Sequence, residues 1–277
     1  MDNEIKNNLN KKKIAKNFSK AAPTYDKWAL PQNIIAKNTI SLLDDNLIPE
    51  NIIDLGCGTG KLINSLQKKF QNSCITGIDI ADGMIKHCTQ KYDKYKNINF
   101  YKKDIEEFST SCCSYNLAIS SFSLQWILNP ISTFLKIHSL LKKNGLFVFS
   151  LPINGTLKEL SDSYEKSLQK KMYSLKYNDE LFYINALQHS NFKILKFKIA
   201  YTQSYFKDID IFRYFKKTGT TLNAMHHESP LKITELNKLV HFYKKKYSNK
   251  DGSIPVSYRV LYIVAKKDPK DESKERY

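Results

Sequence analysis

Short apolar runs alternate with stretches of helical spacing through the first half of the chain. Runs with the length of buried strands occupy residues 52–55, 74–79, 98–101, 115–120 and 146–151. Helical spacing of apolar residues fills 61–70, 82–91 and 131–142. Asn144-Gly145, directly after Lys142-Lys143, is typical of the end of a helix. This alternation predicts an α/β fold in which crossover helices join parallel strands.

Both ends of the chain depart from this alternation. Ile14–Tyr25 and Trp28–Leu43 have helical spacing on either side of a break at Pro23, and helical patterns return at 158–190. Phe192–Ala200 and Val256–Ala265 are rich in β-forming residues and flank a largely helical insertion with many lysines and aromatic residues. We therefore expect four parts: an N-terminal helical segment 1–45, a core of 46–204 with 251–267, an insertion 205–250, and a disordered tail 268–277.

A glycine-rich loop follows the first predicted strand. Asp54-Leu55-Gly56-Cys57-Gly58-Thr59-Gly60 leads into the helical pattern that starts at Lys61. Glycines let the backbone approach a ligand, and a helix N-terminus offers unpaired N–H groups to it. Lys61 stands where a dinucleotide fingerprint has its last glycine, which disfavours a nicotinamide cofactor. Asp79, at the end of the second predicted strand, is placed to accept hydrogen bonds from ribose hydroxyls.

The loop resembles the first motif of class I S-adenosylmethionine-dependent methyltransferases, D/E-x-G-x-G-x-G, which Asp54, Gly56, Gly58 and Gly60 match. The resemblance implies a Rossmann-like fold: a mostly parallel seven-stranded sheet with an antiparallel edge hairpin and a helical insertion or lid. It also implies S-adenosyl-L-methionine as the cofactor. The loop, including Cys57 and Thr59, would hold its methionine part. We interpret Cys57 as a small residue that fits the loop.

Further cofactor contacts are implied by the same resemblance. Asp79 and Ile80 would meet the ribose, and Asp104 would accept from the adenine amine beside the backbone of Ile105. Met84 would pack on adenine, although a plain core role fits it equally well. Ser121 and Phe122 follow the fourth strand, whose end faces the methyl group in this family. That strand begins with Tyr115-Asn116, where many relatives have an aromatic-Asp pair.

Four segments carry a closer resemblance, to the malonyl-[acyl-carrier protein] O-methyltransferases of biotin synthesis. They are the N-terminal segment 14–26, Leu124-Gln125-Trp126, the stretch 213–219 that resembles R-x-L-K-x-T-G, and the last strand 255–262. The family's substrate is the free carboxylate of a malonyl thioester on acyl-carrier protein. We expect a monomeric, cytoplasmic enzyme. Another small-molecule methyltransferase, acting on a quinone or a free acid, and an inactive methyltransferase-like assembly factor are the alternatives.

Three residues are candidates for the methyl-transfer step. Arg213 would orient the malonyl carboxylate or a nearby phosphate, with an ion pair within its helix as the alternative. Tyr25 and Gln125 would line the cofactor pocket near the methyl group. The alternative is that they are simple packing residues. His226-His227 resembles a metal pair, but neighbouring positions on a helix point apart, so we expect no metal.

Composition narrows the remaining classes of function and cellular compartment. The formal net charge is +17, yet only Arg213, Arg259 and Arg276 among the 44 basic residues are arginines, which disfavours nucleic-acid readout. A solvated lysine-rich surface, or a surface for an acidic protein partner, explains the charge better. The chain has no run of 18 apolar residues, so we expect no transmembrane helix. Five cysteines without a zinc-like spacing indicate a reducing compartment.

Overall fold

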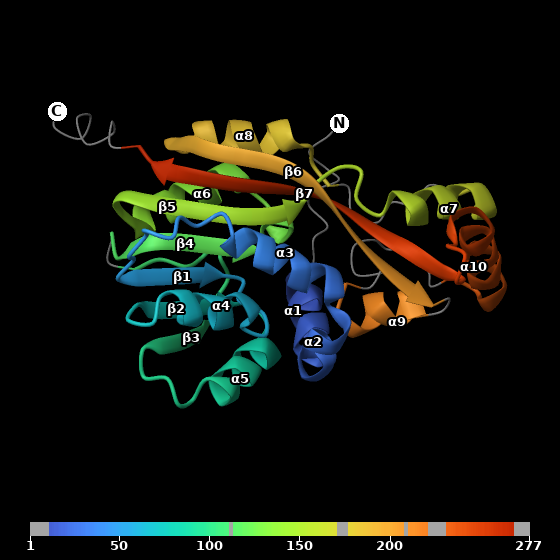
Figure 1. The fold of residues 1–277 in the computed structure, drawn as a ribbon, viewed down its shortest axis with the longest axis horizontal. Helices are drawn as coiled ribbons and strands as arrows, with labels where there is room; N and C mark the ends of the chain where they lie inside the picture. The colour runs from blue at the N-terminus through green and yellow to red at the C-terminus, as the bar shows by residue number, and fades with distance from the viewer. Residues whose placement is uncertain (1–10, 111–112, 171–176, 208–209, 221–230, 269–277) are drawn as a thin grey trace.

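A single seven-stranded sheet organises the protein. The computed structural model describes residues 11–110, 113–170, 177–207, 210–220 and 231–268. The strand order is β3-β2-β1-β4-β5-β7-β6 (Figure 1). The first five strands in chain order are parallel, and β7 is antiparallel to both β5 and β6. The strands are β1 Asn51–Leu55, β2 Cys74–Asp79, β3 Ile98–Lys102, β4 Tyr115–Ser121, β5 Leu141–Pro152, β6 Phe192–Lys207 and β7 Ser253–Lys267. The predicted class I methyltransferase fold is confirmed.

Helices cover both faces of the sheet. Buried residues of α3, α4 and α5 pack on one face, and those of α6 and α8 on the other. The helices α7, α9 and α10 pack on the far part of the β6–β7 hairpin (Figure 1). The helices are α1 Lys11–Ala21, α2 Tyr25–Trp28, α3 Leu30–Ile40, α4 Lys61–Lys69, α5 Asp82–Lys91, α6 Pro130–Leu140, α7 Lys158–Leu168, α8 Glu180–Gln188, α9 Asp210–Lys217 and α10 Ile233–Tyr247, with short 3-10 turns at Ala22–Thr24 and Leu124–Trp126.

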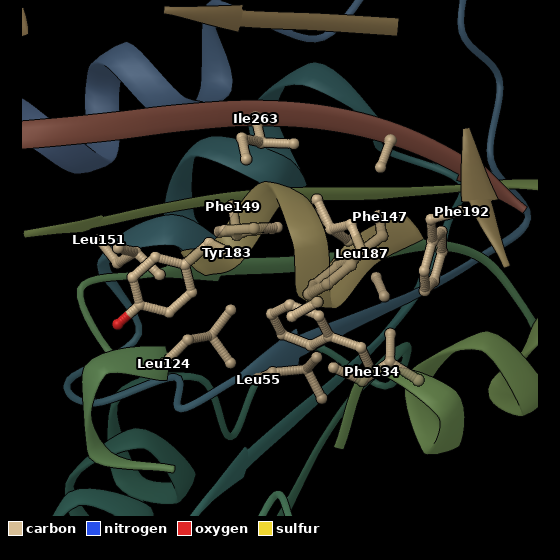
Figure 2. Packing of buried hydrophobic residues seen from close by; sticks show 14 of the residues in the cluster. Leu55, Leu124, Phe134, Phe147, Phe149, Leu151, Tyr183, Leu187, Phe192 and Ile263 are labelled. Atoms are coloured by element: carbon tan, nitrogen blue, oxygen red, sulfur yellow. The ribbon is translucent and has the colours of Figure 1, made fainter. Parts of the chain in front are cut away.

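Aromatic rings fill the core under α6 and α8. Phe134 of α6 meets Phe147 of β5 edge-on, with ring centroids 5.4 Å apart, and Phe147 lies 4.7 Å from Phe149 (Figure 2). All three side chains are fully buried. Burial of a large aromatic side chain is worth several kcal/mol on truncation, so this layer anchors the middle of the sheet and fixes the strand ends that carry the site.

The boundary between α6 and β5 corrects one expectation. We expected a helix through Lys142 that stops at Asn144-Gly145, and a strand from 146. Helix α6 instead ends at Leu140, and Leu141 already pairs with Tyr115 of β4. Leu141 is fully buried, and Asn144 takes a positive φ of 62° where the pairing shifts register. Asn144 and Gly145 thus lie at an irregularity within strand β5 and do not mark the end of a helix.

The hairpin at the sheet edge is longer than its apolar pattern indicates. Strand β6 continues to Lys207, where it pairs with Ser253, so residues 205–207 belong to the strand and not to the insertion. In the part of β6 that follows Ala200, every second side chain is buried. These side chains are Thr202, Ser204 and Phe206. Two of these residues are polar, which is why the strand signal fades in the sequence. The insertion within the described residues contains α9 and α10.

The carboxyl ends of β1, β2, β3 and β4 meet at one edge of the sheet. The chain order reverses between β1 and β4, which are neighbours in the sheet. A crevice forms outside the strand ends at such a point, because the connecting helices leave in opposite directions. The short helices α1 and α2 lie in front of this edge (Figure 1).

Candidate active site

A cavity opens at this switch point, and nearly all predicted cofactor residues line it. Its walls come from the loops after β1, β2, β3 and β4 and from the helices α1, α2 and α3. The predicted residues in the lining are Tyr25, Asp54, Gly56, Cys57, Gly58, Thr59, Asp79, Ile80, Met84, Asp104, Ile105, Ser121 and Phe122. Residues predicted from the sequence at four separate strand ends therefore line one cavity.

The glycine loop is held close to strand β2. The backbone N–H groups of Gly56 and Cys57 both donate to the carbonyl of Ile78, at 2.8 and 2.9 Å. Gly56 has φ of 79°, and a Cβ there would come within 1.8 Å of Ser123 Oγ. A hydrogen bond with Cys88, and then burial, raise the pKa of the Cys57 thiol well above its usual value. The thiol is therefore neutral at physiological pH, and it is poorly suited to act as a nucleophile.

Asp79 is fixed by the backbone at the end of β2. Its Oδ2 accepts from Gly58 N at 2.9 Å, and its Oδ1 accepts from Ala81 N at 2.8 Å. Burial raises the pKa of Asp79, while these two hydrogen bonds act in the opposite direction. A carboxylate has about four acceptor sites, so Asp79 retains capacity to accept from a pair of hydroxyls in the cavity. Ribose hydroxyls meet that requirement.

The burial of the Asp54 carboxylate indicates a role in ligand binding. It is fully buried, and neither carboxylate oxygen has a hydrogen-bond partner among the described residues. Burial, and then the charge of Asp79, raise the pKa of Asp54 well above its usual value. An unpaired buried carboxylate is costly unless a cation or donor approaches it. The predicted cofactor carries an ammonium and a sulfonium, so its cationic end fits this wall of the cavity.

The loop after β3 meets the N-terminal helix. Lys11 Nζ of α1 lies 2.6 Å from Asp104 Oδ2 and also pairs with Glu106. Asp104 Oδ1 accepts from the backbone N–H of Glu106 at 3.0 Å. The ion pair joins α1 to the loop that the sequence assigns to the adenine amine. Lys11 and Asp104 both line the cavity, so the ion pair that holds α1 lies within the cavity, at its β3 end.

The helices α1 and α2 form the outer wall. Phe18 lines the cavity and packs edge-on against Trp126, with ring centroids 5.9 Å apart. Thr59 Oγ1 of the glycine loop donates to Asp26 of α2, which also pairs with Lys91 at 3.3 Å. Gly83 at the start of α5 lies against α1, so closely that a Cβ would come within 2.4 Å of Ser19 O. The N-terminal segment thus covers the site through direct contacts.

Three predicted site residues lie outside the cavity lining. Gly60 takes φ of 77° ahead of α4, and a Cβ there would meet the Tyr92 ring at 2.6 Å, so its role is to shape the loop. Gln125 Nε2 donates to the carbonyl of Phe122 at 2.8 Å, and so supports a cavity residue whose φ is 59°. Arg213 is 63% exposed and pairs with Asp210 at 3.0 Å. His226 and His227 lie outside the described residues.

The cavity also contains residues for which no site role was predicted. Lys61 and Ser123 directly adjoin predicted motifs, so their neighbours in the chain pointed toward them. Gln32 and Asn33 come from α3, a helix read from the sequence only as an apolar pattern. No motif marks them, because their place at the cavity depends on how α3 packs across the sheet.

Comparison with known proteins places the chain in a family. Residues 49–219 match the family model described as "Methyltransferase domain". A malonyl-[acyl-carrier protein] O-methyltransferase of Ilyobacter polytropus is 32% identical over 94% of this chain and 99% of its own length. The chain belongs to the malonyl-[acyl-carrier protein] O-methyltransferase family. A member from Priestia megaterium is 29% identical over 91% of this chain and 96% of its own length.

Solved structures agree on the fold of this malonyl-[acyl-carrier protein] O-methyltransferase family member. Geranyl diphosphate C-methyltransferase from Streptomyces coelicolor has a TM-score of 0.52 at 13% identity, covering 84% of this chain and 78% of its own. The [4+2]-cyclase SpnF has a TM-score of 0.54 at 15% identity, covering 85% and 80%. The same fold thus serves different reactions, so the fold alone does not identify the substrate. None of the helices in the described ranges has the length and apolar character needed to cross a membrane.

Proposed function

We propose that this protein transfers a methyl group from S-adenosyl-L-methionine to the free carboxylate of a malonyl thioester carried on acyl-carrier protein. The observation that carries the proposal is the 32% identity to a malonyl-[acyl-carrier protein] O-methyltransferase across 94% of this chain. The product, a malonyl methyl ester, hides the carboxylate charge. It then resembles the apolar primer that chain elongation toward biotin requires.

Three carboxylates are arranged to hold the cofactor. Asp54 would face its cationic end, Asp79 its ribose and Asp104 its adenine amine, since all three line the cavity. When bound, the cofactor supplies a methyl group on a sulfonium, and the sulfur keeps the bonding electrons when the methyl group leaves. Phe18, Trp126 and the helix α1 form the outer side of this space, where partial exclusion of water would strengthen the electrostatic interactions inside it.

The proposed acceptor needs no general base. A carboxylic acid with a pKa of about 4 is already ionised at neutral pH. The described residues that line the cavity include no histidine, and its carboxylates are assigned to the cofactor. Catalysis would then come from alignment and partial desolvation of the carboxylate beside the sulfonium. Tyr25 lines the cavity, and burial raises the pKa of its phenol, so it would act as a neutral hydrogen-bond donor.

A basic outer surface next to the cavity suits an acidic carrier protein. Lys16 and Lys20 on α1, and Lys216 and Lys217 on α9, are exposed. The two helices meet where Gly219 approaches Asn17 O and Phe18, at 3.2 and 3.1 Å for an added Cβ. We name these four lysines the α1–α9 surface and propose that a monomer of this protein docks the carrier there, in the cytoplasm. Exposed Arg213 on α9 would meet the phosphate of the carrier's pantetheine arm.

A methyl-transfer assay with labelled S-adenosylmethionine tests this function. Malonyl-acyl-carrier protein, malonyl-coenzyme A, free malonate and acetyl-acyl-carrier protein are offered separately. We expect transfer to the malonyl thioesters, fastest with the carrier protein, and none to the acetyl form. Absence of transfer to every malonyl compound would refute the proposal. Binding of S-adenosylhomocysteine by calorimetry shows whether the sample is folded and competent.

A further inference from the structure

The C-terminal end of α5 holds the glycine loop by its carbonyl groups. Three side chains from one side of this helix each donate to one of three successive carbonyls of the loop: Cys88 to Gly58 at 3.1 Å, Lys91 to Thr59 at 3.1 Å and Tyr92 to Gly60 at 2.7 Å. The loop that lines the cavity is therefore fixed from behind, by side chains that lie outside its own motif.

Lys91 also reaches a third element, the helix α2. Its Nζ lies 3.3 Å from Asp26 Oδ2, and the other oxygen of this carboxylate, Oδ1, accepts from Thr59 Oγ1. Lys91, Asp26 and Thr59 thus form a closed ring of three hydrogen-bonded residues, in which Thr59 uses both its hydroxyl and its carbonyl. The Tyr92 hydroxyl, in contrast, bonds only to the loop among the described residues.

This ring stands directly behind two residues of the cavity. Thr59 lines the cavity, and so does Tyr25, the neighbour of Asp26 in α2. Thr59 is 2% exposed, whereas the side chains of Lys91 and Asp26 are 35% and 37% exposed. Because Thr59 belongs to the loop and Tyr25 to α2, the ring fixes the position of one cavity wall relative to the other.

We propose that Lys91 and Asp26 are positioning residues that fasten α2 to the glycine loop and so hold Tyr25 in place beside the bound cofactor. The inference rests on the proposed function, because it assigns the residues that prepare the acceptor side of the cavity. Lys91 lies on the outer side of the loop, so it would act through Thr59 and Asp26 and not by contact with either substrate.

The exposure of the pair limits the size of the effect. An exposed ion pair by itself contributes little to stability. The bond from Thr59 adds to it, because its donor is buried and its acceptor is charged. The helix α2 is also held from α3, where Asn33 Nδ2 donates to Asp26 O at 3.4 Å. Loss of Lys91 should therefore loosen α2 severalfold and leave the fold intact.

Hydrogen exchange followed by mass spectrometry tests the link without any methyl acceptor. Each variant is saturated with S-adenosylhomocysteine, and peptides of α2, β1 and the glycine loop are compared. We expect Lys91→Met to speed exchange in α2 about fivefold, for example at Ala29 N, which donates to Tyr25 O at 2.9 Å, and to leave β1 and the loop within about twofold. Lys86→Met is the matched control, because Lys86 lies on the same helix and pairs with Asp82 of that helix at 2.8 Å. It should exchange like the wild type.

Tyr92→Phe separates support of the loop from the link to α2. It removes the bond to Gly60 O and leaves the ring of Lys91, Asp26 and Thr59 complete. We expect it to weaken binding of S-adenosylhomocysteine about tenfold, while α2 of the saturated protein exchanges at the wild-type rate.

Kinetics distinguish a positioning role from a merely structural one. With malonyl-pantetheine as the acceptor, Lys91→Met should lower kcat about fivefold and leave KM for S-adenosylmethionine within about twofold. Asp26→Ala should lower kcat about tenfold, because it removes both bonds of the carboxylate. The double variant should lose at most about twofold more than Asp26→Ala, because both residues belong to one ring.

Three results would overturn the inference. They are wild-type exchange of α2 in Lys91→Met, an equal increase of exchange in α2, β1 and the loop, and losses of kcat that multiply in the double variant. The exchange measurement needs no acceptor, so it decides the inference even if the wild type methylates no malonyl compound. The two proposals therefore fail separately.

Discussion

At the scale of single residues, three carboxylates at strand ends line the cavity. Asp54, Asp79 and Asp104 follow separate apolar runs, and parallel strands bring their carboxyl ends to one edge. Arg213 shows the limit of the same reasoning. Its scarcity drew attention to it, yet Asp210 lies one helical turn before it and pairs with it at the surface. The apolar side of α9 packs on the protein, which leaves Arg213 on the polar side of this helix.

Replacement of Asp54 by Asn tests the unpaired carboxylate. We expect the affinity for S-adenosylmethionine to fall about 10- to 100-fold, because a charged partner is lost. The free energy of unfolding of the unliganded protein should rise, since burial of an unpaired charge is removed, with Tm higher by roughly 2–4 °C. Calorimetry and thermal unfolding measure both. Unchanged affinity would show that Asp54 does not face the cofactor.

The pH dependence follows from the raised pKa of Asp54. A carboxyl group whose pKa is higher in the folded state stabilises the fold fully below its unfolded value of about 3.9, and this is lost as pH rises through the folded pKa. The stability gap between Asp54→Asn and wild type should therefore widen with rising pH. Asp162→Asn is a control of opposite sign, because hydrogen bonds from Lys166, Lys246 and Tyr247 lower the pKa of Asp162. It should lower stability and leave cofactor affinity unchanged.

At the scale of elements, sequence patterns predicted the existence of helices and strands better than their ends. The fading of β6 after Ala200 comes from Thr202 and Ser204, polar residues that point inward where the hairpin leaves the main sheet. The early start of β5 at Leu141 depends on pairing with Tyr115, a contact made across the sheet. Polar residues that are buried by tertiary contacts carry no local signal, so these boundaries require the assembled fold.

The contact between α1 and α5 provides a test at this scale. Gly83→Ala should weaken cofactor binding and lower Tm, because the added Cβ would meet Ser19 O and Cα at 2.4 and 2.7 Å and push α1 away. Helix propensity alone predicts the reverse, a gain of about 1 kcal/mol. Ser19→Ala is the control, since it removes only the acceptor for Gly83 N, at 3.1 Å. A higher Tm with unchanged affinity in Gly83→Ala would contradict the role of α1 as a cover.

At the scale of the whole molecule, the hairpin carries α9 and α10 out from the sheet and brings α9 back to α1 (Figure 1). The sequence predicted the sheet and an insertion beside the cavity. It did not predict that Gln32, Tyr214 and Tyr258 meet, because they lie on three elements far apart in the chain. Only the complete fold places the helical insertion against the N-terminal segment.

Charge reversal on the α1–α9 surface tests docking of the carrier. Glutamate at Lys16, Lys20, Lys216 and Lys217 together should raise KM for malonyl-acyl-carrier protein about tenfold or more, while turnover of malonyl-pantetheine stays unchanged. The effect should shrink as salt rises. Lys238→Glu with Lys245→Glu, on exposed positions of α10, is the control and should have little effect. Equal losses with both substrates would place the carrier elsewhere.

The position of the transferred methyl group tests the central claim most directly. Malonyl-acyl-carrier protein is incubated with the protein and S-adenosylmethionine labelled in its methyl group, and the product is examined by mass spectrometry before and after treatment with base. We predict one added methyl group per malonyl group, bound to the carboxylate oxygen and released by base as labelled methanol. A label that remains on carbon or sulfur after base, or an unmodified malonyl group, would contradict this account.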